Sequence, residues 1–271
     1  MGSVRTRIKA VLPPPIVQRL VWLKRAVAPS DEHRRADRFL RLCGDPRSVM
    51  QGPFRGLELR QYARGSIKPF YLLGTYEKDL WPFVERMIAW GPDLLVDIGS
   101  ADGYYAVGFA RRLPQLKGIA YEADPFYRHL TRRTASINRC GKRVTTRGFC
   151  DGESLRTELE ASRRPAVFCD CEGYEATLLD PEVVSSQRRA AMLVELHEGK
   201  VPDLVDLLYA RFGSTHHIEV VSQQDRIMAD LPEGVHIGQD QALAMMRNTR
   251  KDSGRWMLLT PVSVEGAEHN A

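Results

Sequence analysis

The sequence from position 96 to 105 reads Val96-Asp97-Ile98-Gly99-Ser100-Ala101-Asp102-Gly103-Tyr104-Tyr105. An apolar run over 94–98 predicts a buried strand, and apolar residues at helical spacing predict a helix over 104–113. The two glycines let the backbone between these elements turn sharply and approach a ligand closely. Open α/β sheets bind ligands at such strand-to-helix loops, so this stretch predicts both a fold class and the position of a site.

Apolar runs and helical patterns alternate along the rest of the chain. Further strands are predicted at 118–122, 143–149, 166–170, 191–196, 217–221 and 255–259, and helices at 125–138 and 202–212, with one more between the last two strands. This alternation indicates an α/β protein with a Rossmann-like, doubly wound, mostly parallel seven-stranded sheet. Periodicity does not fix the order of the strands.

The charges of the loop favour a cationic ligand. The nicotinamide-dinucleotide fingerprint G-x-G-x-x-G fails because position 101 is alanine, which argues against a nicotinamide-dependent oxidoreductase. Asp97 can accept a hydrogen bond from an ammonium group, or it can hold the loop through backbone amides. Glu122 closes the next strand, where a carboxylate can accept from both ribose hydroxyls. S-adenosylmethionine, which carries an amino group and a sulfonium, matches these charges; an ordinary tight turn is the alternative.

Four motifs resemble, in order along the chain, those of the FkbM type of class I S-adenosylmethionine-dependent methyltransferases. They are Gly74-Thr75-Tyr76-Glu77, the loop 97–105, Asp170-Cys171-Glu172-Gly173-Tyr174-Glu175 and Glu195-Leu196-His197. The resemblance covers about 71–197 well and the last strands loosely. The loop departs from the family at 100–102, where Ser-Ala-Asp stands in place of the usual Ala-Asn or Ala-His. The resemblance implies S-adenosylmethionine as cofactor, a late antiparallel strand, and methylation of a hydroxyl on a small-molecule or glycan-like acceptor.

The resemblance also implies which residues contact the cofactor. We expect them before the first strand, in the loop, at the end of the second strand and after the third. They are Glu77, Asp97, Gly99, Ser100, Ala101, Asp102, Gly103, Tyr104, Glu122, Ala123 and Asp151. Asp151 is placed to accept from the adenine amino group, although a carboxylate in a surface turn explains it nearly as well.

Four ionisable residues fall at the carboxyl ends of neighbouring strands, and we expect them to be catalytic: Asp170, Glu172, Glu195 and His197. Methylation of an alcohol requires a group that takes its proton, or a metal that acidifies the hydroxyl. His197 is the first choice for the base because its unperturbed pKa lies near neutrality; a structural histidine is the alternative. Asp170 with Glu195 or His197 could form an oxygen-rich magnesium site, but the spacing does not resemble a closed ligand set.

Composition indicates an ordinary globular protein of 271 residues, with 43% hydrophobic and 27% charged residues. Five cysteines without regular spacing argue against a disulfide framework and for a cytoplasmic location. No apolar run is long enough to span a bilayer. The net charge of +5 permits nucleic-acid binding but does not indicate it.

The N-terminal region differs in charge from the rest. We expect a partly helical, basic extension over 1–65 and a methyltransferase domain over 66–271. Apolar residues recur at helical spacing between 16 and 27, so this helix either packs on the main domain, which is commoner, or rests on an anionic inner membrane surface. The extension could also be a lid or a dimer contact. A degenerate, non-catalytic cofactor-binding module that acts through a partner is the alternative function.

Overall fold

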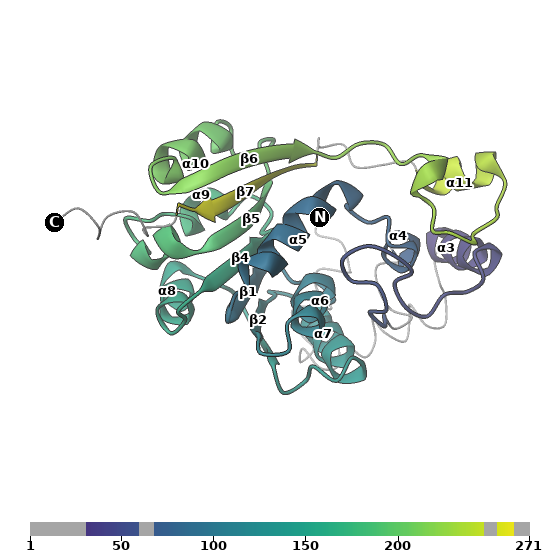
Figure 1. Cartoon of the computed structure of the whole chain (residues 1–271), viewed down its shortest axis with the longest axis horizontal. Helices are drawn as coiled ribbons and strands as arrows, with labels where there is room; N and C mark the ends of the chain where they lie inside the picture. Colours follow the sequence, from purple (N-terminus) through teal and green to yellow (C-terminus); the bar gives the residue numbers. More distant parts are fainter. Residues whose placement is uncertain (1–30, 60–67, 247–253, 263–271) are drawn as a thin grey trace, which may run out of the picture.

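The computed structural model describes residues 31–59, 68–246 and 254–262. Figure 1 shows a central sheet with helices packed on both sides. Its seven strands are β1 (Leu94–Ile98), β2 (Lys117–Tyr121), β3 (Val144–Arg147), β4 (Pro165–Cys169), β5 (Ala191–Leu196), β6 (His216–Ser222) and β7 (Arg255–Pro261). The order in the sheet is β3-β2-β1-β4-β5-β7-β6, and β7 runs antiparallel to both of its neighbours. The predicted Rossmann-like sheet with a late antiparallel strand is confirmed.

Helices precede, connect and follow these strands. The described α-helices are α3 (Asp31–Leu42), α4 (Lys68–Leu73), α5 (Trp81–Trp90), α6 (Tyr104–Arg112), α7 (Pro125–Ile137), α8 (Gly152–Glu160), α9 (Glu175–Leu178), α10 (Leu204–Phe212) and α11 (Gln239–Met246). Three short 3₁₀ helices are η1 (Lys78–Leu80), η2 (Ser185–Arg189) and η3 (Met228–Asp230). None of the helices within the described ranges is long and apolar enough to cross a membrane.

The strands place alternate side chains in two separate hydrophobic cores, one on each face of the sheet. In β1, Leu95 packs in the core that also holds side chains of α5 and α6, whereas Leu94 and Val96 pack in the core that holds side chains of α8 and α10. This follows from the two-residue period of a strand. Both faces of β1 are therefore buried, as expected for a central parallel strand.

Most predicted elements differ from the structure by one or two residues at an end, and two of these differences have a local physical reason. A strand is predicted over 143–149, but β3 ends at Arg147, because its partner β2 ends at Tyr121 and offers no further pairing. A helix is predicted over 202–212, but α10 begins at Leu204, since Asp203 has a φ of 62° and cannot belong to a right-handed helix.

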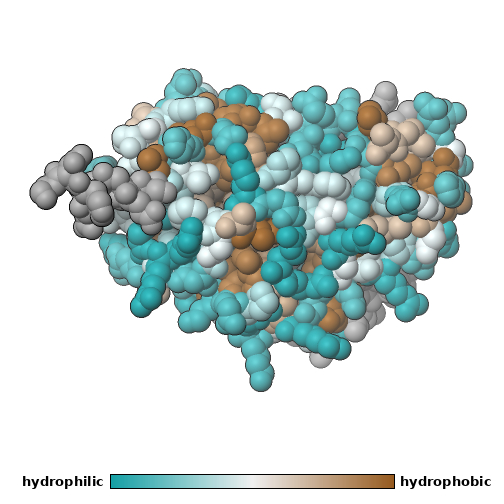
Figure 2. Space-filling model, viewed as in Figure 1, coloured by the Kyte–Doolittle hydropathy of each residue, from teal (hydrophilic) through white to brown (hydrophobic). Residues whose placement is uncertain are grey.

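The N-terminal residues that the structure describes pack on the sheet domain. Leu40, Val49 and Leu57 belong to the same core as α6, and the ring of Phe54 makes an edge contact with Phe109 at 5.5 Å between centroids. Figure 2 shows a mostly hydrophilic surface on which apolar residues gather at the end where α3 and α11 lie and also on the opposite half of this view. The predicted amphipathic helix over 16–27 lies outside the described residues, and the division at residue 65 stays a prediction.

Candidate functional site

One cavity of about 520 Å³ lies at the carboxyl ends of β1, β2, β4 and β5. This is the edge of an open α/β sheet at which ligands bind. Most of the site residues expected from the sequence line it: Asp97, Gly99, Ser100, Ala101, Tyr104, Glu122, Ala123, Asp170, Glu172, Glu195 and His197. Residues from the loop after β1 and residues from the ends of β4 and β5 thus share one cavity.

The glycine loop passes against the end of β4. Gly99 has a φ of 84°, and a Cβ built on it would lie 1.8 Å from the carbonyl oxygen of Asp170. Gly103 also has a φ of 84°, and its Cβ would lie 2.9 Å from Thr131 Cγ2. Ala101, between them, takes a left-handed φ of 45° despite its side chain. Only glycine fits at position 99, and the close approach holds this loop beside the motif that begins at Asp170.

Asp97 is buried beneath the loop, and its Oδ2 accepts a hydrogen bond of 2.9 Å from the backbone N–H of Ala106 in α6. Burial raises the pKa of this carboxyl to about 8, and the charges of Asp170, Glu122 and Asp102 add to the rise. The hydrogen bond from Ala106 opposes it. This end of the cavity therefore disfavours a further negative charge and would be stabilised by a cationic ligand.

Glu122 also holds the loop through backbone amides. Its Oε2 accepts from the N–H of Ala101 at 3.0 Å, and its Oε1 accepts from the N–H of Asp124 at 2.8 Å. Asp97 and Glu122 are thus tied to the backbone as well as lining the cavity. An acceptor oxygen has two lone-pair sites, so these bonds leave acceptor capacity for a ligand.

Aromatic rings line a part of the cavity that we call the aromatic wall, and of these rings the sequence predicts Tyr104 alone at the site. Tyr71, Tyr76, Tyr104, Tyr105 and Phe168 all line it. Tyr105 and Phe168 are stacked with centroids 3.8 Å apart, and Tyr71 stacks on Tyr104 at 4.5 Å. The paired tyrosines at 104–105 are the sequence signal that could have indicated this wall.

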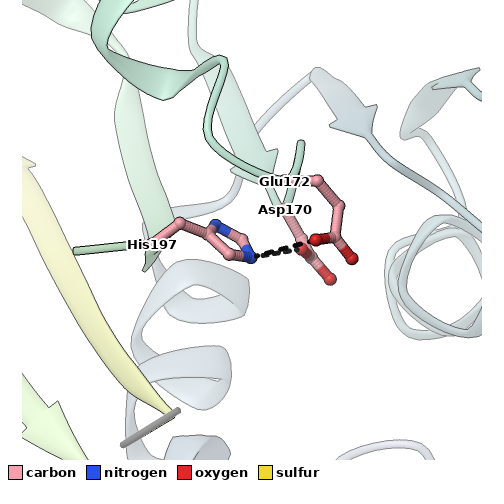
Figure 3. A group of neighbouring side chains, drawn as sticks. All are labelled: Asp170, Glu172 and His197. Carbon is pink, nitrogen blue, oxygen red and sulfur yellow. Dashed lines mark ion pairs between the residues drawn. The ribbon is translucent and has the colours of Figure 1, made fainter. Parts of the chain in front are cut away.

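Around His197 the ends of β4 and β5 bring together a group that we call the histidine cluster: Asp170, Glu172, Glu175, Glu195 and His197. The Nδ1 atom of His197 lies 2.8 Å from Glu175 Oε1. Its Nε2 lies 3.6 Å from Asp170 Oδ1, 3.9 Å from Glu172 Oε2 and 3.7 Å from Glu195 Oε2. Figure 3 shows the imidazole from the end of β5 directed at the two carboxylates of the loop after β4.

The carboxylates around His197 raise the pKa of its imidazole. Burial alone would lower the pKa of His197, but the hydrogen bond and charge of Glu175, with the charges of Asp170 and Glu172, outweigh it and raise the pKa. Burial likewise opposes the charge on Glu175, but the hydrogen bond and charge of His197, together with backbone hydrogen bonds, outweigh it and lower the pKa of that carboxyl. Glu175 belongs to the motif 170–175 but is not among the residues expected at the site from the sequence.

Four residues expected at the cofactor do not line the cavity: Glu77, Asp102, Gly103 and Asp151. Glu77 is buried and accepts a hydrogen bond from the Tyr105 hydroxyl. It therefore contacts a ring that lines the cavity rather than the cavity itself. Asp102 is buried within the loop itself. Asp151 is exposed and caps α8, with its Oδ1 accepting from the N–H of Ser154 at 2.8 Å. Other residues of its loop, Gly148 to Cys150, line the cavity instead.

No protein-family model matches the sequence, and a search of curated proteins finds no significant match. Solved structures with a similar arrangement include an O-methyltransferase from Bacillus cereus in complex with SAH, with 12% identity, 88% of this chain and 95% of that chain covered, and a TM-score of 0.45. They also include Precorrin-6y C5,15-methyltransferase from Geobacter metallireducens GS-15 (15% identity, 53% and 75% covered, TM-score 0.41). A third is the human methyltransferase 10 domain containing protein (12% identity, 67% and 78% covered, TM-score 0.42). Likeness at this level assigns no family, substrate or site residue to this chain.

Proposed function

We propose that this chain is an S-adenosylmethionine-dependent methyltransferase of the FkbM type that methylates a hydroxyl on a small-molecule or glycan-like acceptor. The observation that carries the proposal is the single cavity that joins the acidic glycine loop to the histidine cluster. A cofactor-binding end and a proton-accepting end lie on the same sheet edge, as a methyl transfer to an alcohol requires.

The loop end has the properties that S-adenosylmethionine needs. The positive φ of Gly99 and the lack of a Cβ bring the backbone of the loop into the wall of the cavity. Asp97 and Glu122 present carboxyl groups there. Burial raises the pKa of Asp97, and crowding with the neighbouring carboxylates raises it further. A ligand with an ammonium and a sulfonium offsets that crowding. These features support Asp97 as the partner of the amino group and Glu122 as the partner of the ribose hydroxyls.

The histidine cluster supplies the second requirement, which is a group that receives the proton of the acceptor hydroxyl. S-adenosylmethionine supplies, when bound, a methyl group on a positively charged sulfur. The residues of the chain then hold the acceptor oxygen in line behind that carbon and receive its proton. The cavity lining at this end includes His197, Asp170, Glu172 and Glu195. The acceptor class itself rests on the resemblance to the FkbM family.

Isothermal titration with S-adenosylmethionine, its demethylated product and NAD tests the proposal. We expect micromolar binding of the first two and none of NAD. Asp97→Ala and Glu122→Gln should remove most of that affinity, because each deletes a carboxylate of the loop end. Glu160→Gln is the matched control, since Glu160 is an exposed carboxylate at the end of α8.

Each outcome of the titration tests a different part of the proposed function. If the unmodified chain does not bind S-adenosylmethionine, both the proposed cofactor and the proposed methyltransferase activity are refuted. Binding without turnover across a panel of hydroxylated acceptors would instead support a non-catalytic module that acts through a partner. A melting temperature measured on every variant separates lost contacts from lost fold, because Asp97 also holds α6.

A further inference from the structure

The histidine cluster leaves a gap between three ligand-type atoms. One nitrogen of His197 and one carboxylate oxygen each from Asp170 and Glu172 lie within 4.8 Å of one another. The distances from Nε2, 3.6 Å to Asp170 Oδ1 and 3.9 Å to Glu172 Oε2, are too long for hydrogen bonds. The three side chains point toward one another (Figure 3), and the two contacts from Nε2 are ion-pair contacts rather than hydrogen bonds.

These separations suit a shared metal ion. Nitrogen and oxygen ligands stand about 2.0–2.2 Å from a small divalent cation, so two ligands of one ion lie about 3–4 Å apart at ordinary angles. Both distances from Nε2 fall in that range. The three donors come from two neighbouring strand ends. The sequence suggests Asp170 with Glu195 or His197, and the structure brings Glu172 into the set.

Glu175 supplies an independent indication. It is fully buried, and its Oε1 accepts from the N–H of Cys171 at 3.1 Å and pairs with His197 Nδ1 at 2.8 Å. This fixes the imidazole with Nε2 directed at Asp170 and Glu172. The side chain of His197 is only 10% exposed, and no described residue hydrogen-bonds to its Nε2. Metal-binding histidines are held in this way, with the other ring nitrogen on a carboxylate.

The balance of charge points the same way. Asp170, Glu172, Glu175 and Glu195 surround one imidazole, and the like charges repel one another in a partly buried setting. Lys200 contacts this group from its exposed side through Glu172. Lys200 neutralises only part of this repulsion, because it contacts Glu172 at the exposed edge of the group. A divalent cation bound by Asp170, Glu172 and His197 would offset the rest.

We propose that Asp170, Glu172 and His197 bind a divalent cation of the manganese and magnesium class, with Glu175 orienting the histidine. Two carboxylates favour such a cation, and manganese also accepts an imidazole. The role of the ion rests on the proposed methyltransferase function: it lies in the wall of the cavity, where it would acidify an acceptor hydroxyl beside it. His197 then serves as a ligand, and Glu195 is the remaining carboxylate that can take the proton.

Titration of the metal-free chain with Mn²⁺, followed by the electron paramagnetic resonance signal of free Mn²⁺, tests the site without a cofactor or an acceptor. We expect one ion per chain. His197→Ala and Asp170→Asn should each weaken binding by about 100-fold, and Glu172→Gln by about tenfold, because Glu172 is 70% exposed on its side chain. Glu198→Gln is the matched control, since Glu198 follows His197 directly but pairs with Arg255.

A change in the opposite direction makes the test stricter. Lys200→Gln removes the ammonium that competes for Glu172 and should tighten Mn²⁺ binding several-fold. Unchanged affinity in both Glu172→Gln and His197→Ala, or absence of binding by the unmodified chain, would overturn the site. If His197→Ala does not fold, the Mn²⁺ affinity of Glu172→Gln still tests the site. Because S-adenosylmethionine binding is measured separately, a missing metal site and a missing cofactor site give different results.

Discussion

The two ends of the cavity hold their carboxylates in different ways. At the loop end, Asp97 and Glu122 accept hydrogen bonds from backbone amides of Ala106, Ala101 and Asp124. In the histidine cluster the ionisable groups face one another, and His197 is the shared partner. A carboxylate bound to backbone amides shapes the loop as well as any ligand site, whereas one that faces another ionisable group is available for proton or metal chemistry.

The difference predicts that the loop end tolerates less change in shape. In Gly99→Ala the added Cβ would collide with the Asp170 carbonyl at 1.8 Å and would sit at a φ of 84°. We expect a loss of more than about 3 kcal/mol in the free energy of unfolding, since overpacking and a left-handed φ add up. Chemical denaturation measures it.

Gly148→Ala is the control for that substitution. Gly148 also lines the cavity, but a Cβ there meets nothing within 4 Å, and the unfolding free energy should change by less than about 1 kcal/mol. Equal losses in the two variants would contradict the idea that the loop is held against β4 by close approach at Gly99.

The cluster end should show the reverse pattern, with large effects on turnover and small effects on cofactor affinity. His197→Ala removes the imidazole that the four carboxylates surround, whether it acts as proton acceptor or as ligand. We expect turnover to fall by about 10²-fold or more, and the affinity for S-adenosylmethionine to change by less than about threefold. Steady-state kinetics and titration calorimetry give the two numbers. Retained turnover would remove His197 from the mechanism.

Asp97 provides a pH test of the loop end. Its folded pKa of about 8 lies above the ordinary value, so the folded chain binds a proton that the unfolded chain has released. The stability contributed by the protonated form is fully present below the unfolded pKa and is lost as pH rises toward 8. We expect the free energy of unfolding of the ligand-free chain to fall by a few kcal/mol between about pH 4 and pH 8, and this slope to flatten in Asp97→Asn. A slope unchanged by the substitution would show that burial does not hold Asp97 protonated.

Much of the fold could be predicted from the sequence because its signals are local. The strand run 94–98, the glycines that follow it and the alternation of strands and helices depend on neighbours in the chain, and β1 and α6 form as expected. The end of β3 could not be predicted, because it depends on where β2 stops. The late antiparallel strand came from the resemblance, since periodicity carries no information on strand order.

The site was predictable where a motif carried it and not where the fold assembled it. The loop residues and His197 follow from motifs. Glu175 and Lys200 enter through contacts across 22 and 28 positions in sequence, to His197 and Glu172, which no spacing rule indicates. The rings of Tyr71 and Phe168 reach the cavity from separate elements in the same way. Long-range contacts of this kind depend on the packing of the whole sheet.

The smallest expected effect concerns Asp151, which the resemblance assigns to the adenine and the structure places at the start of α8. Loss of its cap on the Ser154 N–H in Asp151→Ala should cost about 1 kcal/mol of unfolding free energy. If the cap is its whole role, the affinity for S-adenosylmethionine will change by less than about twofold, since the side chain is exposed and outside the cavity lining. A loss of tenfold or more, with Asp151→Asn partly restoring stability but not affinity, would show that the carboxylate contacts the adenine. The loop end of the cavity would then extend past β3 to the first turn of α8.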